Sequence, residues 1–103
     1  MDQFIDLIEK IIQRPEVYIG KPSVERLYAF LNGYLHRNQE VGYDWNHAFN
    51  GYVANHYGIT SAHNWADIIV FFSSNENEAF ASFATHFHAF ISSNAFIFNS
   101  ESR

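Results

Sequence analysis

Arg14-Pro15-Glu16-Val17-Tyr18-Ile19-Gly20 is the stretch that decides how this chain folds, because it separates two segments with helical periodicity. Pro15 fixes its own φ and disfavours helical geometry at Arg14, so the first helix should end there. Gly20 is free to adopt a positive φ, and Lys21-Pro22 should keep the following residues extended. The heptad therefore predicts a bend at each of its two ends.

The apolar residues 17–19 lie between these bends, where an exposed turn would have little reason to carry them. We expect them to pack beneath the first helices, with the Tyr18 hydroxyl and the Arg14 guanidinium bound to polar partners at the rim. Buried aromatics in corners usually serve packing. Arg14, Pro15, Tyr18 and Gly20 are accordingly predicted to be the structural residues of a corner.

Amphipathic helices are predicted on both sides of this corner. Residues 2–13 carry apolar side chains at helical spacing, with charged and amide side chains opposite them. A second helix should begin after Ser23 as its N-cap and fade near Asn38. Gly33 inside that helix indicates a close contact with another helix.

A third helix is predicted after a turn at residues 41–43. Asp44 should be its N-cap, and Gly58 should end it as the glycine that follows the last helical turn. The apolar residues 95–98 at the other end of the chain should fold back onto the core.

Two further helices are predicted from their capping residues. Asn64 should cap a helix from Trp65 to about Ser73, although residues 67–73 include an apolar run that would also fit a buried strand. Asn75 with Glu78 resembles a capping box and should open a helix that runs to Ile91.

The fold class follows from this pattern of helices and short connections. We expect one all-α domain over residues 1–103, a compact bundle of about five helices around a Phe-rich core. Eight of the eleven phenylalanines lie between Phe71 and Phe98, so the second half should supply most of that core.

Charge and composition exclude several classes of function. Six Lys and Arg against eleven Asp and Glu give a net charge of −5, which argues against a nucleic-acid partner. No apolar run has the length of a membrane span, and the N-terminus lacks the pattern of a signal peptide, so we expect a cytoplasmic protein without a membrane partner. The absence of cysteine excludes disulfides, thiolate metal sites and Cys nucleophiles.

No metal, cofactor or catalytic group is predicted. His86 and His88 are two positions apart and point to different faces of a helix, and the other four histidines lack the spacing of a helical metal site. Asp67, Glu76 and Glu78 fall at expected helix N-termini, where capping and the helix dipole explain acidic residues without catalysis.

The heptad is similar to the R-P-G-M-Y-I-G segment near the N-terminus of the ATPase subunit of type II topoisomerases, which lies beside the nucleotide. Glu16 and Val17 stand where that pattern has glycine and methionine. The chain has no D-x-G-x-G and no glycine-rich lid, and its five scattered glycines offer no phosphate cradle. The similarity implies a shared local geometry, and nucleotide binding is not expected.

A wider layout resembles a family of small bacterial proteins. It consists of a short helix, R-P-x-x-Y-I-G, Leu27-Tyr28-Ala29-Phe30-Leu31-Asn32-Gly33-Tyr34, an aromatic third helix, and Trp65-Ala66-Asp67-Ile68-Ile69 before Glu78-Ala79-Phe80. Some members of that family are immunity proteins beside polymorphic or contact-dependent inhibition toxins. The resemblance covers Phe4 to Ile91 and implies a non-enzymatic inhibitor that binds a cognate toxin domain and blocks its active site.

If the toxin is a nuclease, its Lys and Arg side chains would attract an acidic inhibitor. The contact surface should then carry carboxylates interleaved with aromatic anchors. Two stretches fit this description: residues 40–45, and the turn between the fourth and fifth helices. The candidate partner-binding residues are Glu40, Tyr43, Asp44, Asp67, Glu76 and Glu78. Asp44, Asp67 and Glu78 would each also fit a role as helix caps alone.

Two other functions fit the residues. The chain could be a self-associating structural or regulatory module, a homodimer whose seam is Phe96-Ile97-Phe98. It could also bind a small molecule in a pocket lined by Tyr18, Tyr34, Trp45 and His47.

Overall fold

The computed structural model describes residues 2–37, 39–61 and 63–93, and within these ranges it places the side chains of residues 3–37, 45–61 and 63–93. The described part forms six helices and no strand, which confirms the all-α fold and makes residues 67–71 helical. The helices are α1 (Asp2–Gln13), α2 (Pro15–Tyr18), α3 (Val24–Arg37), α4 (Gln39–Tyr57), α5 (Trp65–Phe71) and α6 (Glu76–Ser92).

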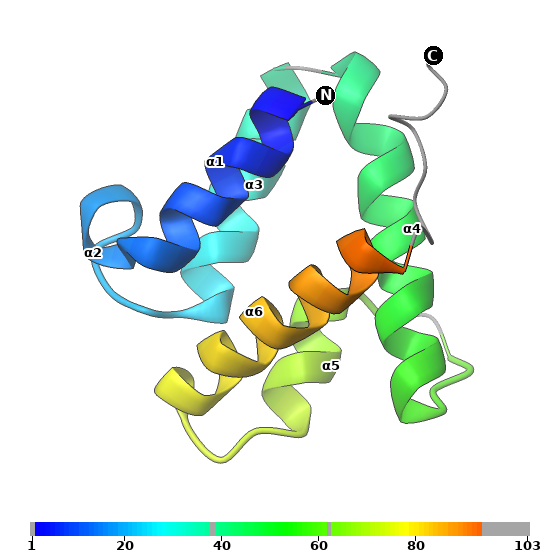
Figure 1. Cartoon of the computed structure of the whole chain (residues 1–103). Coiled ribbons are helices and arrows are strands. Elements are labelled where there is room, and N and C mark those ends of the chain that lie inside the picture. The colour runs from blue at the N-terminus through cyan, green and yellow to red at the C-terminus, as the bar shows by residue number, and fades with distance from the viewer. Residues whose placement is uncertain (1, 38, 62, 94–103) are drawn as a thin grey trace.

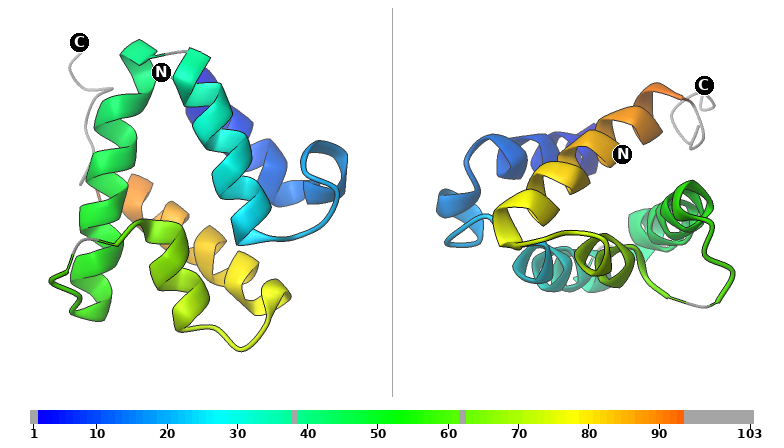
Figure 2. Two further views of the ribbon diagram at one scale, coloured as in Figure 1. Left: turned by 180° about the vertical axis from the view of Figure 1, so that it is seen from behind. Right: turned by 90° about the horizontal axis from the view of Figure 1, so that it is seen from below.

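The helices pack in two layers. Seen from below, α1 and α6 form one layer, and α3, α5 and α4 form the other (Figure 2). Helices α3 and α4 diverge from the end at which they approach each other, and the short α5 lies between their far ends (Figures 1 and 2). Because α5 contacts α3, α4 and α6, its position depends on the packing of all three.

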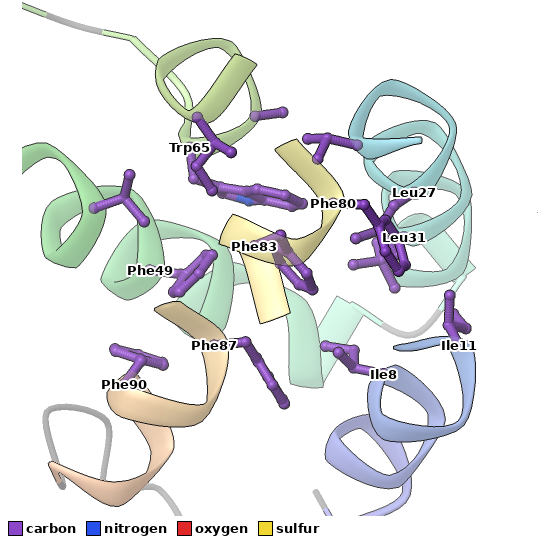
Figure 3. Packing of buried hydrophobic residues seen from close by; sticks show 14 of the residues in the cluster. Ile8, Ile11, Leu27, Leu31, Phe49, Trp65, Phe80, Phe83, Phe87 and Phe90 are labelled. Carbon is purple, nitrogen blue, oxygen red and sulfur yellow. The ribbon is translucent and has the colours of Figure 1, made fainter. Parts of the chain in front are cut away.

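Aromatic rings fill the space between the two layers. Trp45 and Trp65 are fully buried, and their ring centroids lie 6.0 Å apart in an edge-to-face arrangement. Figure 3 shows Phe83 of α6 between Phe49 of α4 and the leucines of α3. Each buried ring of this kind contributes about 1.5–3 kcal/mol through removal of apolar surface from water. The predicted Phe-rich core is confirmed, and α6 supplies Phe80, Phe83, Phe87 and Phe90 to it.

The corner has the two predicted bends with one turn of helix between them. Arg14 adopts non-helical dihedrals, and Pro15 occupies the first position of α2, where its missing N–H costs nothing. Gly20 has a φ of +90° as expected. The prediction that residues 17–19 all pack inward was wrong for Val17, which is 61 % exposed, while Ile19 is buried. A single helical turn cannot point three successive side chains to one face.

Polar partners at the corner match the prediction in part. Arg14 Nε donates to Glu16 Oε2 at 3.2 Å, and this bond together with a backbone N–H lowers the pKa of Glu16. The half-buried Tyr18 packs against the core, but its hydroxyl forms no hydrogen bond with the described part of the chain. Tyr18 therefore serves this corner through its ring.

The start of α4 differs from the prediction. Residues 41–43 lie inside α4 rather than in a turn, so Asp44 is a helix-interior residue and not an N-cap. Gly42 costs a helix about 1 kcal/mol relative to alanine. The nineteen-residue α4 buries Trp45, Phe49 and Val53, and burial at about 1.5–3 kcal/mol for each large side chain outweighs that cost. Gly58, with a φ of +69°, ends α4 as predicted.

Gly33 does not mark a close helix contact. It is exposed, and a Cβ added to it would meet no atom within 4 Å. Three of the four N-cap predictions are confirmed, Asp44 being the exception: the Ser23 hydroxyl accepts from the backbone N–H of Arg26, and the side chains of Asn64 and Asn75 cap α5 and α6.

Candidate functional site

The exposed aromatic residues of the described part lie at the end of α5. Phe71 is 79 % exposed, Phe72 is 47 % exposed and Val70 is 37 % exposed. Helical periodicity explains this exposure: Trp65, Ile68 and Ile69 form the buried face of α5, so Val70 and Phe71 point outward. The apolar run therefore carries more apolar side chains than one helix face can bury.

A groove of about 590 Å³ adjoins these exposed side chains. Its walls come from α5 and from the segment after α4, and its volume lies in the range of sites that hold ligand or partner side chains. The lining residues are Ile59, Ser61, His63, Asp67, Ile68, Val70, Phe71 and Phe72. Most of this lining is apolar, and Asp67 is its carboxylate.

A smaller hollow of about 200 Å³ lies on the other side of Val70. Glu25 of α3 and Glu76 of α6 are among its lining residues, and Val70 lines both the hollow and the groove. The two depressions are therefore neighbours. We call Glu25, Asp67, Val70, Phe71, Phe72 and Glu76 the α5 surface.

The carboxylates around this surface have different local partners. Asp67 Oδ2 accepts from Asn64 Nδ2 at 3.2 Å, and Glu76 Oε1 lies 3.2 Å from Lys21 Nζ. Neither Asp67 nor Glu25 forms an ion pair with a side chain that the structure describes. The rim of the α5 surface consequently carries an excess of negative charge.

Glu78 has a structural role at the start of α6. Its Oε1 accepts from the backbone N–H of Ser74, while its own N–H donates to Asn75 Oδ1 at 2.8 Å. This reciprocal arrangement matches the predicted capping box in its purpose, since it satisfies N–H groups at the helix start. We therefore leave Glu78 out of the α5 surface.

A buried polar cluster supports Phe72 from behind. The ring of Tyr57 stacks on Phe72 with centroids 4.5 Å apart, and the Tyr57 hydroxyl lies 2.8 Å from Nε2 of the buried His86. Burial and the neighbouring His56 ring both lower the pKa of His86, so its imidazole is neutral near pH 7. Phe72 therefore packs on the Tyr57 ring, which the hydrogen bond to His86 holds in position.

The structure brings together only part of the predicted site. Asp67 lines the groove and Glu76 lines the neighbouring hollow. The backbone of Glu40, Tyr43 and Asp44 belongs to the first turns of α4, and their side chains lie outside the described residues. Figure 1 places that end of α4 at the opposite end of the molecule from α5. The two predicted stretches do not form one surface.

The sequence reasoning missed Glu25 and the exposure of Val70, Phe71 and Phe72. The run at 68–72 is apolar throughout, so its sequence fits either a helix or a buried strand and does not show which of its side chains are exposed. The shortness of the helix is the signal for this exposure. With Asn64 as its cap, a seven-residue helix has only about two turns. One buried face of such a helix cannot include the side chains of residues 70 and 71.

His86 and His88 point to different surroundings, as their spacing predicted. His86 is buried beside Tyr57, whereas His88 is exposed and lies 2.9 Å from Glu9 Oε1. Within the described ranges, no three His, Asp or Glu side chains are grouped as metal ligands. None of the helices in those ranges combines the length and apolarity needed to cross a bilayer.

Two of the four residues suggested for a small-molecule pocket, Trp45 and His47, do not share one environment. Trp45 is fully buried, with the rings of Phe4, Phe49, Trp65 and Phe87 packed around it. His47 is exposed on the same helix, two positions away, and so faces a different side.

No family model, curated protein or solved structure matches the chain.

Proposed function

We propose that this chain is an immunity protein, a non-enzymatic inhibitor that binds a cognate toxin domain through the α5 surface and blocks the active site of that domain. The observation that carries the proposal is the exposure of Phe71 at 79 % and of Phe72 at 47 % beside a groove that holds Asp67 and a neighbouring hollow that holds Glu25 and Glu76. An apolar centre with a polar rim is the usual organisation of protein interfaces.

The aromatic centre supplies affinity. Interface energy is concentrated in a few aromatic or Arg anchors that become fully buried on binding. Burial of the exposed part of Phe71 would contribute about 1.5–3 kcal/mol, and the Tyr57 ring beneath Phe72 limits the entropy lost when that side chain is immobilised. The α5 surface therefore has both an exposed anchor and a supported one.

The negative rim supplies partner selection. With a net charge of −5 and carboxylates at Glu25, Asp67 and Glu76, the surface favours a basic partner and accelerates its approach. A nuclease domain binds phosphates with Lys and Arg, so we infer a nuclease as the toxin. The family resemblance of the sequence points to a toxin domain as the partner, and the nuclease class rests on the charge alone.

Co-expression tests this function. If the gene directly upstream encodes a large secreted protein, the C-terminal domain of that protein should co-purify with this chain and lose its toxic activity in the complex. Phe71→Ala should weaken that complex about thirtyfold, because truncation of an interface anchor costs about 2 kcal/mol or more. Val17→Ala is the matched control, since Val17 is 61 % exposed but lies in α2, away from α5, and should not change the affinity.

Both variants should unfold at the temperature of the wild type, because each side chain is mostly exposed. Equal affinities of Phe71→Ala and Val17→Ala for the toxin domain would contradict binding of that domain at the α5 surface. Failure of any upstream domain to bind would remove the immunity function.

Self-association is the second candidate, because the exposed Phe71 of one copy could enter the groove of another. The predicted seam at residues 96–98 lies outside the described residues. Two α5 surfaces facing each other would, however, oppose carboxylate to carboxylate, and like charges across an interface disfavour association. A concentration series in light scattering separates the candidates. Self-association through Phe71 predicts a dimer that Phe71→Ala converts to a monomer, whereas the immunity proposal requires no such dimer.

A further inference from the structure

The groove beside α5 has a mixed character that restricts its occupant. Its walls are mostly apolar and include the rings of Phe71 and Phe72. The exposed Asp67 supplies its carboxylate, and Ser61 and His63 are its other polar residues. An aromatic wall next to a carboxylate is a combination that binds a cation by ring attraction and by ion pairing together.

Asp67 retains an oxygen for such a partner. Its backbone N–H donates to Asn64 Oδ1 at 2.7 Å, and its Oδ2 accepts from Asn64 Nδ2 at 3.2 Å. No hydrogen bond from a described side chain reaches Oδ1, and no described cation pairs with this carboxylate. The Asn64 contacts hold the carboxyl group at the groove without neutralising its charge.

Any partner that covers the groove must also remove water from Asp67. An apolar occupant would leave a desolvated carboxylate without a counter-charge, which is costly, and an acidic occupant would add repulsion. A lysine ammonium would pair with the carboxylate but is compact and strongly hydrated. The guanidinium group of arginine is planar, less hydrated and able to stack on an aromatic ring while it donates to a carboxylate.

We propose that the groove between α5 and the segment after α4 receives an arginine side chain of the partner protein, which pairs with Asp67 and lies on the Phe71 and Phe72 rings. This inference rests on the proposed function, and it identifies the group that the α5 surface recognises. Glu25 and Glu76 border the other hollow and act at longer range on the same partner.

A capped tetrapeptide of alternating leucine and arginine provides the probe, with a matched peptide in which citrulline replaces arginine. Citrulline keeps the shape of arginine and removes its charge. Titration followed by amide chemical shifts should place the arginine peptide at residues 59–72. The citrulline peptide should bind about tenfold more weakly, because it lacks both the ion pair and the cation–π attraction.

Asp67→Asn is the decisive variant. It keeps the backbone bond to Asn64 and the shape of the side chain, and it should abolish the preference for arginine over citrulline. Asp6→Asn is the control: this carboxylate pairs with Lys10 on α1 and does not line the groove, so the preference should persist. A lysine peptide should bind more weakly than the arginine peptide.

The inference fails if millimolar arginine peptide moves no amide of residues 59–72, if citrulline binds as well as arginine, or if Asp67→Asn keeps the preference. Its failure differs from failure of the immunity function. If the arginine test fails but Phe71→Ala still weakens binding of a toxin domain, the immunity function holds and only the arginine contact is wrong. If the groove prefers arginine but no toxin domain binds, the groove chemistry holds and the immunity function is wrong.

Discussion

At the residue scale, the two tryptophans of the core occupy similar volumes but have different hydrogen bonding. Both are fully buried. Trp65 Nε1 donates to Asn46 Oδ1 at 2.9 Å, whereas Trp45 Nε1 finds no partner among the described residues. A buried N–H without an acceptor loses its hydration and gains nothing in return. Trp45 therefore stabilises the core through the packing of its rings and not through its Nε1 hydrogen bond donor.

This difference predicts unequal costs for equivalent substitutions. Trp65→Phe should lower the free energy of unfolding by about 1 kcal/mol more than Trp45→Phe, since only the first substitution removes a formed hydrogen bond. Urea unfolding followed by circular dichroism measures both values under one protocol. Equal costs, or a larger cost at Trp45, would contradict the assignment of the bond to Trp65 alone.

At the element scale, the corner is held by contacts between neighbouring elements. Arg26 Nη1 of α3 donates to the carbonyl of Ile19 at 2.9 Å, which fixes the end of α2 against α3. Gly20 lies directly beside this contact with a φ of +90°. A Cβ at Gly20 would come within 2.5 Å of Arg26 Nη1. The backbone conformation favours glycine here, and a Cβ would in addition displace the end of the Arg26 side chain from Ile19.

Two glycine substitutions should consequently have opposite effects. Gly20→Ala should destabilise the fold by about 1–2 kcal/mol through strain at positive φ and displacement of Arg26. Gly33→Ala should stabilise it by about 0.5–1 kcal/mol, because Gly33 lies in α3 with open space around it. Thermal unfolding of both variants measures these changes in stability. A loss of stability in Gly33→Ala would contradict the finding that the space around Gly33 is open.

Local signals were sufficient to predict most of the helices. Pro15, Ser23, Gly58, Asn64 and Asn75 act on their own backbone neighbourhood, and each of these ends or caps lies as predicted. The start of α4 was missed because a helix that buries large rings overrides the weak turn signals of its first residues.

The candidate site could be predicted only in part for the same physical reason. Asp67 and Glu76 are visible as acidic residues at helix starts. The exposure of Phe71, in contrast, depends on which face of α5 meets α3, α4 and α6, and that is decided by tertiary packing. The joining of Glu25 to Glu76 around one hollow likewise needs α3 and α6 side by side.

At the scale of the whole molecule, the two-layer bundle buries or half-buries the Phe, Tyr and Trp rings of the described residues except those of Phe71 and Phe72, which form an exposed aromatic ledge at the end of α5. The described carboxylates Glu25, Asp67 and Glu76 border that ledge. The other predicted stretch, at the first turns of α4, lies at the far end of the molecule. A partner of ordinary interface size would cover one of these two regions without the other.

Amide hydrogen exchange of this chain with and without the cognate toxin domain tests the central claim most directly. We expect slower exchange in the complex at residues 64–76, which span the α5 cap, α5 and the turn into α6. Slower exchange confined to the first turns of α4, with residues 64–76 unchanged, would contradict the assignment of partner binding to the α5 surface.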